Sequence, residues 1–334
     1  MNIPILSGIY TSLAGDFKSS YPMNLIPVPK QSGVSDSYLK TADGIIRFDV
    51  GSLAGVDRGG INWNGVLYRV VGTKLVRISE AGSVSVLGDV GGGGRCSFDY
   101  SFTRLSIQSG MNLYYYTGAS LIRVTDVDLG NVLDQIWVDG YFMTTDGTSL
   151  VVTELTDSTA VNPLKYGSSE IDPDKIVGLL KLRGEVLALN RYTIETFQNV
   201  GGSFFPFQRI SGALIQKGII GKDAKCKVAQ TFAFVGNGRN EPVSVWLGNG
   251  SNAVKIATRE IETLLNQYSE SELSKIIVES VEREAHQHLY IHLPNETLVF
   301  DAAGSGAAQQ PVWFILRSGA AMDAAYRAVN FIYA

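Results

Sequence analysis

All three histidines of this chain lie within seven residues, in the stretch His286-Gln-His-Leu-Tyr-Ile-His292. Imidazole nitrogens are common ligands of zinc, so this stretch is the first candidate for a metal site. In an extended strand side chains point alternately to opposite sides, and the even spacing places His286, His288 and His292 on the same side. The apolar residues between them then form the opposite, buried side. The pattern predicts a β-strand whose histidine side is polar and faces outward.

The geometry of a strand argues against a metal site built from these three residues alone. A strand rises ~3.3 Å per residue, so His292 would lie about 13 Å from His288. Metal–nitrogen bonds of ~2 Å cannot bridge that distance. Two imidazoles at positions i and i+2 could share an ion, but the site would need further ligands from another strand, which the sequence does not reveal. We therefore reject His286, His288 and His292 as a metal site, predict no metal and no cofactor, and expect the strand at a subunit contact.

Other residues that could carry chemistry give weaker signals. The stretch TDVDLGN, with Asp126 and Asp128, partly resembles a calcium loop, but Trp137 stands where the bidentate glutamate is required. The stretch GGGGRC from Gly91 lacks the GK[ST] ending of a phosphate-binding loop, and we read it as a flexible connection. No G-x-S-x-G motif is present, and no histidine lies elsewhere to activate a nucleophile. We predict no catalytic residues and no enzyme, although scattered carboxylates leave a glycan-cleaving protein open as the alternative.

Composition limits the class of protein. The 334 residues include 36 glycines, and charged residues make up 18%, below the ~25% of an average soluble protein. The formal net charge of −4 argues against general attraction to nucleic acid. Cys96 and Cys226 form no CxxC pair, which predicts two thiols in a reducing compartment. The N-terminus has no basic start, and no apolar run approaches the ~18 residues that span a bilayer. We expect a soluble chain made in a cytoplasm.

The elements that must position these residues recur along the chain. Each unit is an alternating apolar run, a turn and a second alternating run, as in VLYRVVGTKLVRIS from Val66. Intervals between equivalent markers mostly lie near the ~40–50 residues of a four-stranded propeller blade. We predict an all-β protein, a β-propeller of six or seven blades, with a β-sandwich as the alternative. The markers are Leu67, Leu113, Tyr141, Val186, Phe232, Leu289 and Val329, and the turn positions are Gly72, Gly118, Gly147 and Asn295.

Two intervals depart from this period. The interval from Leu113 to Tyr141 spans only 28 residues and predicts an abbreviated blade. The interval from Phe232 to Leu289 spans 57 residues and predicts an insertion. An apolar stripe at helical spacing after Thr258, followed by a capping-box sequence, predicts a short helical insertion near 258–275.

Two further segments fall outside the blade pattern. Residues 156–174 contain turn formers and two prolines with little periodicity, which predicts an irregular loop that binds a partner. The last residues, YRAVNFIYA, read as an apolar strand with no returning strand, so we expect the chain to continue beyond residue 334 in the full protein. The predicted domains are an N-terminal segment with the first strands, 1–56, and the β-propeller, 57–334.

Several long strings resemble the packaged-DNA stabilisation proteins of short-tailed bacteriophages, which are also called tail accessory or head-completion proteins. The similarity covers nearly the whole chain, and family members run on beyond residue 334. The strings are NLIPVPKQSGVSDSYLKTADGIIRF from Asn24, DRGGINWNGVLYRVVGTKLVRI from Asp57, LGNVLDQIWVDGYFMTTDGTSLVVTELTD from Leu129 and NPLKYGSSEIDPD from Asn162.

The resemblance implies a structural protein of the virion tail rather than an enzyme. Its family forms a hexameric ring that lies below the portal and its adaptor, closes the DNA channel after packaging, retains the genome and takes part in genome ejection. The implied partners are further copies of the chain, portal-adaptor proteins, the tail needle and tailspikes. Encapsidated DNA would pass through without sequence-specific binding, and no membrane is involved. A glycan-binding or glycan-cleaving β-propeller remains the alternative.

We expect the partner contacts in the two segments that lie outside the blades. These are the N-terminal segment before Tyr38 and the irregular segment from Thr156, which share a high content of Pro, Gly and Ser. The predicted interface residues are Tyr21, Lys30, Tyr38, Asn162, Lys165, Tyr166 and Asp172.

Overall fold

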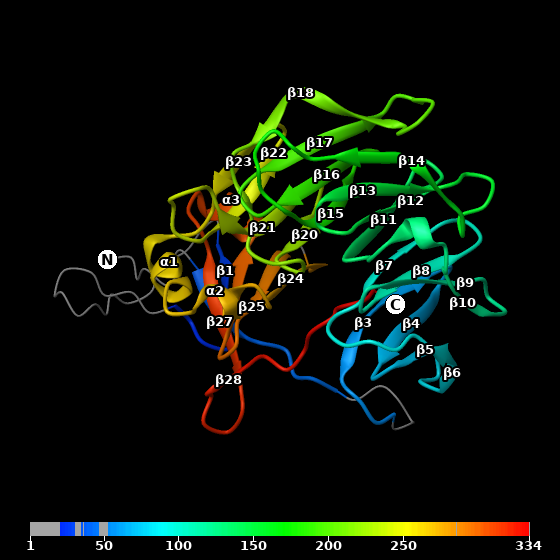
Figure 1. The fold of residues 1–334 in the computed structure, drawn as a ribbon. Coiled ribbons are helices and arrows are strands. Elements are labelled where there is room, and N and C mark those ends of the chain that lie inside the picture. Colours follow the sequence, from blue (N-terminus) through cyan, green and yellow to red (C-terminus); the bar gives the residue numbers. More distant parts are fainter. Residues whose placement is uncertain (1–20, 31–34, 36, 47–52, 285, 334) are drawn as a thin grey trace. The chain divides into compact units, whose positions relative to one another are not determined.

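This computed structural model describes residues 21–30, 35, 37–46, 53–284 and 286–333. Within these residues the chain forms short antiparallel strands and three short α-helices (Figure 1). It divides into two compact units. The larger unit comprises 46–222, 250–252 and 330–334, and the smaller unit comprises 1–45, 223–249 and 253–329. The domain boundary expected after residue 56 stays a prediction.

Four sheets of four strands make up most of the described part of the larger unit (Figure 1). Within each sheet the strands pair antiparallel and follow chain order, which is the arrangement of a propeller blade. A 3₁₀ turn, η1 (Val127–Leu129), precedes the third sheet, and the two-residue strand β19 (Gly218–Ile219) follows the fourth. The four sheets are β3 (Asp57–Trp63), β4 (Val66–Val71), β5 (Lys74–Ile78), β6 (Val84–Asp89); β7 (Ser97–Tyr100), β8 (Leu105–Ser109), β9 (Asn112–Tyr116), β10 (Leu121–Arg123); β11 (Asp134–Val138), β12 (Tyr141–Thr145), β13 (Ser149–Thr153), β14 (Val161–Ser168); and β15 (Ile176–Leu182), β16 (Glu185–Asn190), β17 (Ile194–Asn199), β18 (Phe207–Ile215).

Two-residue turns set the register of three of these sheets. Asn64 and Gly65 connect β3 to β4, and their φ angles are both positive, at 55° and 76°. A type I′ turn has this geometry, and Asn-Gly is its preferred sequence because both positions tolerate positive φ. Positive φ also occurs at both residues between β11 and β12 and between β15 and β16. The local sequence therefore explains the first hairpin of each of these sheets.

The smaller unit contains a hairpin, two larger sheets and the helices. In one of the two five-stranded sheets, strands β24 to β28 pair in chain order. The hairpin lies against this sheet, because the backbone N–H of Asn24 donates to the carbonyl of Ile315 at 2.8 Å. The elements are β1 (Leu25–Pro29), β2 (Ser37–Thr41), β20 (Lys225–Val228), β21 (Thr231–Asn237), β22 (Ser244–Asn249), β23 (Asn252–Lys255), α1 (Arg259–Leu265), α2 (Glu270–Leu273), β24 (Ile277–Arg283), β25 (His286–His292), β26 (Thr297–Asp301), α3 (Ala302–Ala308), β27 (Trp313–Ser318) and β28 (Ala324–Ala325).

The helical insertion predicted near 258–275 is confirmed. Helices α1 and α2 lie between β23 and β24, with Thr258 as the N-cap of α1 and a capping box of Ser269 and Glu272 at the start of α2. Helix α3 is not predicted by the sequence pattern, because it contains two glycines, which are poor helix formers. Its N-cap, Asp301, accepts a hydrogen bond from the backbone of Gly304 at 2.9 Å. No helix in the described residues is long and apolar enough to cross a membrane.

The core of the larger unit lies between successive sheets. One cluster joins Met143 and Leu150 of the third sheet to Val186 and Ala188 of the fourth, and all four side chains are fully buried. Burying a side chain such as leucine contributes about 1.5–3 kcal/mol. Packing of one sheet on the next therefore stabilises strand pairs that would be marginal alone.

A buried arginine holds the connection between β6 and β7. The guanidinium of Arg58 donates to the carbonyls of Gly72 at 3.0 Å, Gly91 at 2.7 Å and Gly94 at 2.5 Å, and to Ser109 Oγ at 2.8 Å. Only 6% of Arg58 is exposed. The stretch GGGGRC from Gly91, which we read as a flexible connection, is therefore held in place by hydrogen bonds from the buried guanidinium of Arg58.

The short marker interval does not reflect an abbreviated blade. Leu113 lies on β9, the third strand of its sheet, whereas Tyr141 lies on β12, the second strand of the next. The prediction is wrong because similar alternating runs occur on both strands. Of the expected turn residues, Gly72, Gly118 and Gly147 have positive φ, but Asn295 is not among the described residues that do.

Residues 156–174 are not an irregular loop throughout. Strand β14 covers Val161–Ser168 and pairs with β13 as the outer strand of its sheet. Proline lacks a backbone N–H, so Pro163 is compatible with an outer strand but breaks the pattern of a central one. The sequence prediction fails here because an outer strand buries few side chains and alternates weakly.

The last described residues are not a strand either. Regular structure ends with β28, and the prediction of an apolar strand in YRAVNFIYA is wrong. Instead, Asn330 is held by polar contacts in the larger unit. Arg69 Nη2 donates to its backbone carbonyl at 2.7 Å, Arg95 Nε donates to its Oδ1 at 2.8 Å, and its Nδ2 donates to Asp57 Oδ2 at 2.7 Å. These hydrogen bonds, and not an apolar pattern, fix the position of this segment.

Candidate functional site

The histidine stretch forms β25, the second strand of the sheet of β24 to β28. Pairing with β26 places His288 opposite Asp301 and His292 opposite Thr297. The rings stack along one face of the strand: the centroids of His286 and His288 lie 5.1 Å apart, and His292 stacks on the neighbouring tyrosine. The predicted strand with its histidines on one side is therefore confirmed.

The histidine face is not the polar outer side that the sequence predicts. His288 and His292 are only 7% and 9% exposed. Phe314 of β27 meets the ring of His288 edge-on. Phe314 belongs to a buried apolar cluster, and Ile26 of β1 and Ala42, the residue after β2, pack against that cluster. The prediction is wrong because a segment far away in the sequence covers this face, which no local pattern records.

His292 occupies a polar cluster of its own. Its Nδ1 lies 3.2 Å from Thr297 Oγ1, and its Nε2 lies 3.5 Å from Glu279 Oε2. These partners come from the strands on either side of β25. His292 is thus engaged with groups that His286 and His288 do not share.

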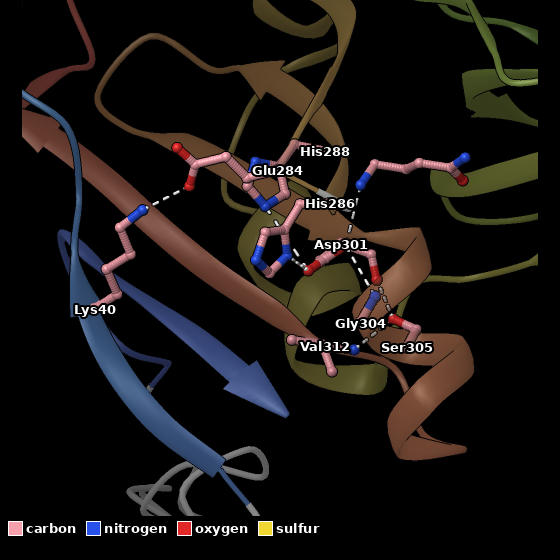
Figure 2. A network of polar contacts seen from close by, with 9 residues as sticks. Lys40, Glu284, His286, His288, Asp301, Gly304, Ser305 and Val312 are labelled. Atoms are coloured by element: carbon pink, nitrogen blue, oxygen red, sulfur yellow. Dashed lines mark hydrogen bonds and ion pairs between the residues drawn. The ribbon is translucent and has the colours of Figure 1, made fainter. Parts of the chain in front are cut away.

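His286 and His288 instead converge on Asp301 (Figure 2). His286 Nδ1 lies 2.5 Å from Asp301 Oδ2, and His288 Nε2 lies 3.8 Å from the same oxygen. One donor atom from each residue falls within 4.8 Å of the other two. Asp301 is the kind of ligand from another strand that a two-histidine site would need. The hairpin itself carries the signal for it, because a turn at 293–296 fixes the pairing of His288 with Asp301.

Burial controls the protonation state of His288. Removal from water lowers its pKa to about 4, the carboxylate of Asp301 opposes this shift, and His286 adds to it. His288 is therefore neutral at pH 7 and keeps a lone pair on one ring nitrogen. A neutral imidazole is the form of histidine that binds metal ions.

Three of the predicted interface residues lie around the N-terminal hairpin. The hydroxyl of Tyr21 shares a hydrogen bond with Thr258 Oγ1 at 2.6 Å. The ammonium group of Lys30 lies 5.4 Å from the centre of the Tyr38 ring, which is a cation–π contact. Lys30 is exposed, and Tyr38 is 45% exposed. Lys30 and Tyr38 are therefore accessible on this unit, whereas Tyr21 is engaged at the start of α1.

The other four lie on β14 or in the turn after it. Lys165 forms an ion pair with Glu154 at 2.8 Å, and Asn162 Oδ1 accepts a hydrogen bond from the backbone two residues on. Tyr166 is 61% exposed, and Asp172 lies half-buried in the following turn. The structure thus brings three of the four onto one outer strand.

Sequence reasoning missed the apolar residues near these positions. Leu164, two residues before Tyr166 on β14, is 62% exposed, and Ile171 in the following turn is 42% exposed. Contiguous exposed apolar side chains are typical of surfaces that meet a partner, and the partner contact expected here stays a prediction. The signal was the alternation of Leu164 and Tyr166 with polar neighbours, which places both on one face. We call Leu164 and Tyr166 the β14 surface.

The other chemical candidates have structural roles. Asp126 Oδ1 accepts from the backbone of Asp128, and its Oδ2 accepts from the backbone of Val161, both at 2.9 Å. Because both oxygens bind backbone N–H groups, Asp126 caps η1 and fixes the start of β14. Cys96 is buried and Cys226 half-buried, and both are thiols.

Six sheets of four or more strands in the described residues define the chain as a six-bladed β-propeller. The chain belongs to the Phage_stabilise family, described as Bacteriophage P22 Gp10, beta-propeller, whose model matches residues 1–334. The predicted fold class and the family resemblance are both confirmed.

The chain is similar to the tail hub protein gp10 of Salmonella phage P22. The two are 30% identical over 360 residues, which cover 99% of this chain and 72% of that protein. The resemblance to a curated tail protein therefore extends over essentially the full sequence given.

Solved structures give weaker likenesses. The WD40 domain of Pan2 from Neurospora crassa matches with a TM-score of 0.48 and 9% identity, over 79% of each chain. PorZ of the type-IX secretion system of Porphyromonas gingivalis matches with a TM-score of 0.45 and 11% identity, over 75% of this chain and 32% of that chain. Likeness at this level bears on neither the function nor the partners of this chain.

Proposed function

We propose that this chain is a structural subunit of a phage tail that assembles with further copies of itself into a hexameric ring. The ring would lie below the portal and its adaptor, close the DNA channel after packaging, retain the genome and connect to the tail needle. The observation that carries this proposal is the family match over residues 1–334. The similarity to a protein named as a tail hub supports a location in the tail.

The charge of the chain suits a channel through which DNA must move. Contacts between phosphates and Lys or Arg give strong, salt-dependent binding. The chain carries 28 basic and 32 acidic residues, for a formal net charge of −4. A net acidic ring would let DNA slide, so retention of the genome would depend on the interfaces that close the channel.

The low content of charge also suits a closed ring. Charged residues make up 18% of the chain, and charge is depleted at the cores of protein interfaces. Identical subunits can close a ring when each presents two different surfaces to its neighbours. A ring of this kind holds its contents by interface area and needs no covalent step.

We place one contact with a neighbouring subunit or with the adaptor at the β14 surface. Leu164 and Tyr166 are both more than half exposed there, on the outer strand of a sheet. Pro163 removes a backbone donor from the same edge, so a partner would bind through side chains and not by adding a strand. Lys30 and Tyr38 form the second proposed contact.

Isolated portal–adaptor particles test the assembly directly. The purified chain is mixed with the particles, and the mixture is examined by negative-stain electron microscopy. We expect added density with six-fold symmetry below the adaptor. A chain that stays unbound in the mixture and releases reducing sugar from the polysaccharide of the host surface would refute the tail role and establish the glycan-cleaving alternative.

A pair of matched variants tests the β14 surface. Tyr166→Asp places a charge in the proposed interface and should lower ring occupancy by about tenfold or more, because burying an unpaired charge is costly. Val86→Asp changes another exposed apolar residue on an outer strand, 54% exposed on β6, and should assemble like the unmodified chain. Point substitutions are needed because β14 is part of a sheet, and deleting it would disturb the fold. Equal assembly by both variants would remove β14 from the interface.

A further inference from the structure

Three side chains from two neighbouring strands meet near the surface of the smaller unit (Figure 2). His286 and His288 come from β25, and Asp301 ends β26. The planes of the two imidazole rings are inclined by only 27°, and each ring presents a nitrogen to Asp301 Oδ2. Cross-strand pairing of His288 with Asp301 creates this convergence.

We propose that His286, His288 and Asp301 bind a divalent transition-metal ion, for which Zn²⁺ is the best match. The ligand atoms would be Nδ1 of His286, Nε2 of His288 and Oδ2 of Asp301. Two imidazoles and one carboxylate are an established donor set for zinc, and they leave a fourth position open for water. This site is independent of the proposed role in the tail.

The ring of His288 gives the evidence that a ligand belongs there. Its Nε2 is buried and makes no hydrogen bond within the part of the chain that the structure describes. The side chain is 8% exposed, and the 3.8 Å between Nε2 and Asp301 Oδ2 is too long for a hydrogen bond. A buried polar atom without a partner is unfavourable. An ion between these two atoms would supply the missing partner.

One pair of donor atoms already lies near the separation that a tetrahedral ion requires, and a second pair must move apart. With metal–ligand bonds of about 2.0–2.1 Å, neighbouring ligand atoms are about 3.4 Å apart. The 3.8 Å between His288 Nε2 and Asp301 Oδ2 is within a few tenths of an ångström of this value. His286 Nδ1 and Asp301 Oδ2 are joined by a hydrogen bond of 2.5 Å, which the ion would replace, so these two atoms must move apart by about 1 Å. His286 is the first residue of β25 and can make this shift by turning its side chain.

The carboxylate of Asp301 is already oriented for this role. Its Oδ1 accepts hydrogen bonds from the backbone of Gly304 at 2.9 Å and of Gln287 at 3.4 Å, which leaves Oδ2 facing the histidines. Ser305 Oγ donates to the carbonyl of Asp301 at 2.6 Å (Figure 2). Hydrogen bonds that fix a ligand from behind are typical of built metal sites. Capping of α3 and metal binding use different oxygens, so they do not compete.

The cluster can be reached from solvent on one side. The side chain of His286 is 18% exposed, whereas His288 and Asp301 lie deeper, so an ion would enter past His286. On the rim, Glu284 forms an ion pair with Lys40 of β2 at 2.8 Å (Figure 2). A surface pocket of about 320 Å³ leads to His286 and is lined by Glu282, Arg283, Glu284, His286, Gln287 and Ala303.

Isothermal titration calorimetry measures the binding directly. The chain is treated with a chelator, dialysed and titrated with Zn²⁺, and we expect one ion per chain. His288→Gln and Asp301→Asn should each weaken zinc binding by about a hundredfold or more. Even substitution of a residue that only hydrogen-bonds to a metal ligand lowers metal affinity by about 10–100-fold. An asparagine oxygen can still accept from Gly304, so Asp301→Asn preserves the cap of α3.

His292→Gln is the matched control. It removes a buried histidine from the same strand, four residues beyond His288, without altering any of the three donors. This variant should bind zinc like the unmodified chain. Circular dichroism spectra of all variants verify that each one folds.

Cobalt(II) provides a second readout that does not depend on heat. Tetrahedral coordination of Co²⁺ gives strong visible absorption, which should appear with the unmodified chain and with His292→Gln and be lost in His288→Gln. The melting temperature of the unmodified chain should also rise with added zinc, because binding to the folded state stabilises it. The proposal fails if the unmodified chain binds no stoichiometric zinc, or if both ligand variants bind as it does.

Discussion

Two buried polar clusters, one in each unit, differ in how completely their hydrogen bonds are satisfied. In the larger unit Arg58 donates to three carbonyls and a hydroxyl. In the smaller unit His288 Nε2 is buried beside Asp301 and forms no hydrogen bond with any described residue. A satisfied buried cation stabilises the chain around it, whereas an unsatisfied nitrogen gains most from a ligand. Incomplete bonding, more than burial alone, distinguishes a binding site from a structural one.

Substitution of Arg58 should produce the largest effect on stability. Arg58→Met should lower the free energy of unfolding by about 3 kcal/mol, because buried carbonyls such as those of Gly72 and Gly91 lose their donor. Arg77→Met, on an exposed residue of β5, should change it by less than about 0.5 kcal/mol. Urea denaturation of both variants checks this. Similar losses in the two variants would show that the buried cluster has no special structural role.

Substitution of Asp301 should rank second. Asp301→Ala removes the cap of α3 and the partner of His286, and should cost about 2 kcal/mol. Asp301→Asn keeps an oxygen for the cap and should cost about 1 kcal/mol or less. Both are measured by denaturation in the presence of a chelator. If the two substitutions cost the same, the hydrogen bond from Gly304 to Asp301 contributes nothing to the stability of α3.

Substitution of His288 gives the sharpest contrast with Arg58. In the presence of a chelator, His288→Leu should change the free energy of unfolding by less than about 1 kcal/mol, because it removes a buried nitrogen that has no partner to lose. With zinc at 100 times its dissociation constant, the unmodified chain should gain about 2.7 kcal/mol that the variant lacks. Paired melting curves with chelator and with zinc test this. A large loss already present in chelator would mean that His288 is structural.

The β14 surface should give the smallest effect on stability. Tyr166 is 61% exposed, so Tyr166→Asp should change the free energy of unfolding by less than about 0.5 kcal/mol. The substitution should impair ring assembly and leave both buried clusters unchanged. A melting temperature well below that of the unmodified chain would instead assign Tyr166 to the fold.

The repeated strands could be predicted from the sequence because their causes are local. Alternating side chains, the Asn64-Gly65 turn and the caps at Thr258 and Ser269 all act over a few residues. Strand β14 was missed because an outer strand interrupted by Pro163 need not alternate cleanly. Helix α3 was missed because it depends on a cap, Asp301, that compensates for its glycines.

The site was less predictable because it combines local and distant causes. The spacing within β25 showed which side the histidines share, and the short turn before β26 carried enough information to pair His288 with Asp301. The burial of His288 was not visible in the sequence, because it depends on Phe314 of β27, whose cluster is in turn covered by Ile26 and Ala42 near the other end of the chain. The unsatisfied Nε2 of His288 indicates a binding site only because it is buried, since an exposed nitrogen would bind water.

The hydrogen bonds of Asn330 make the last described segment sensitive to deamidation of this residue. Its side chain offers one acceptor to Arg95 and one donor to Asp57, so the joint depends on the two ends of the amide being different. Slow deamidation would turn it into a carboxylate, which has no N–H to donate and would face Asp57 with like charge. A change of one atom group would then loosen this segment while leaving every apolar contact in place.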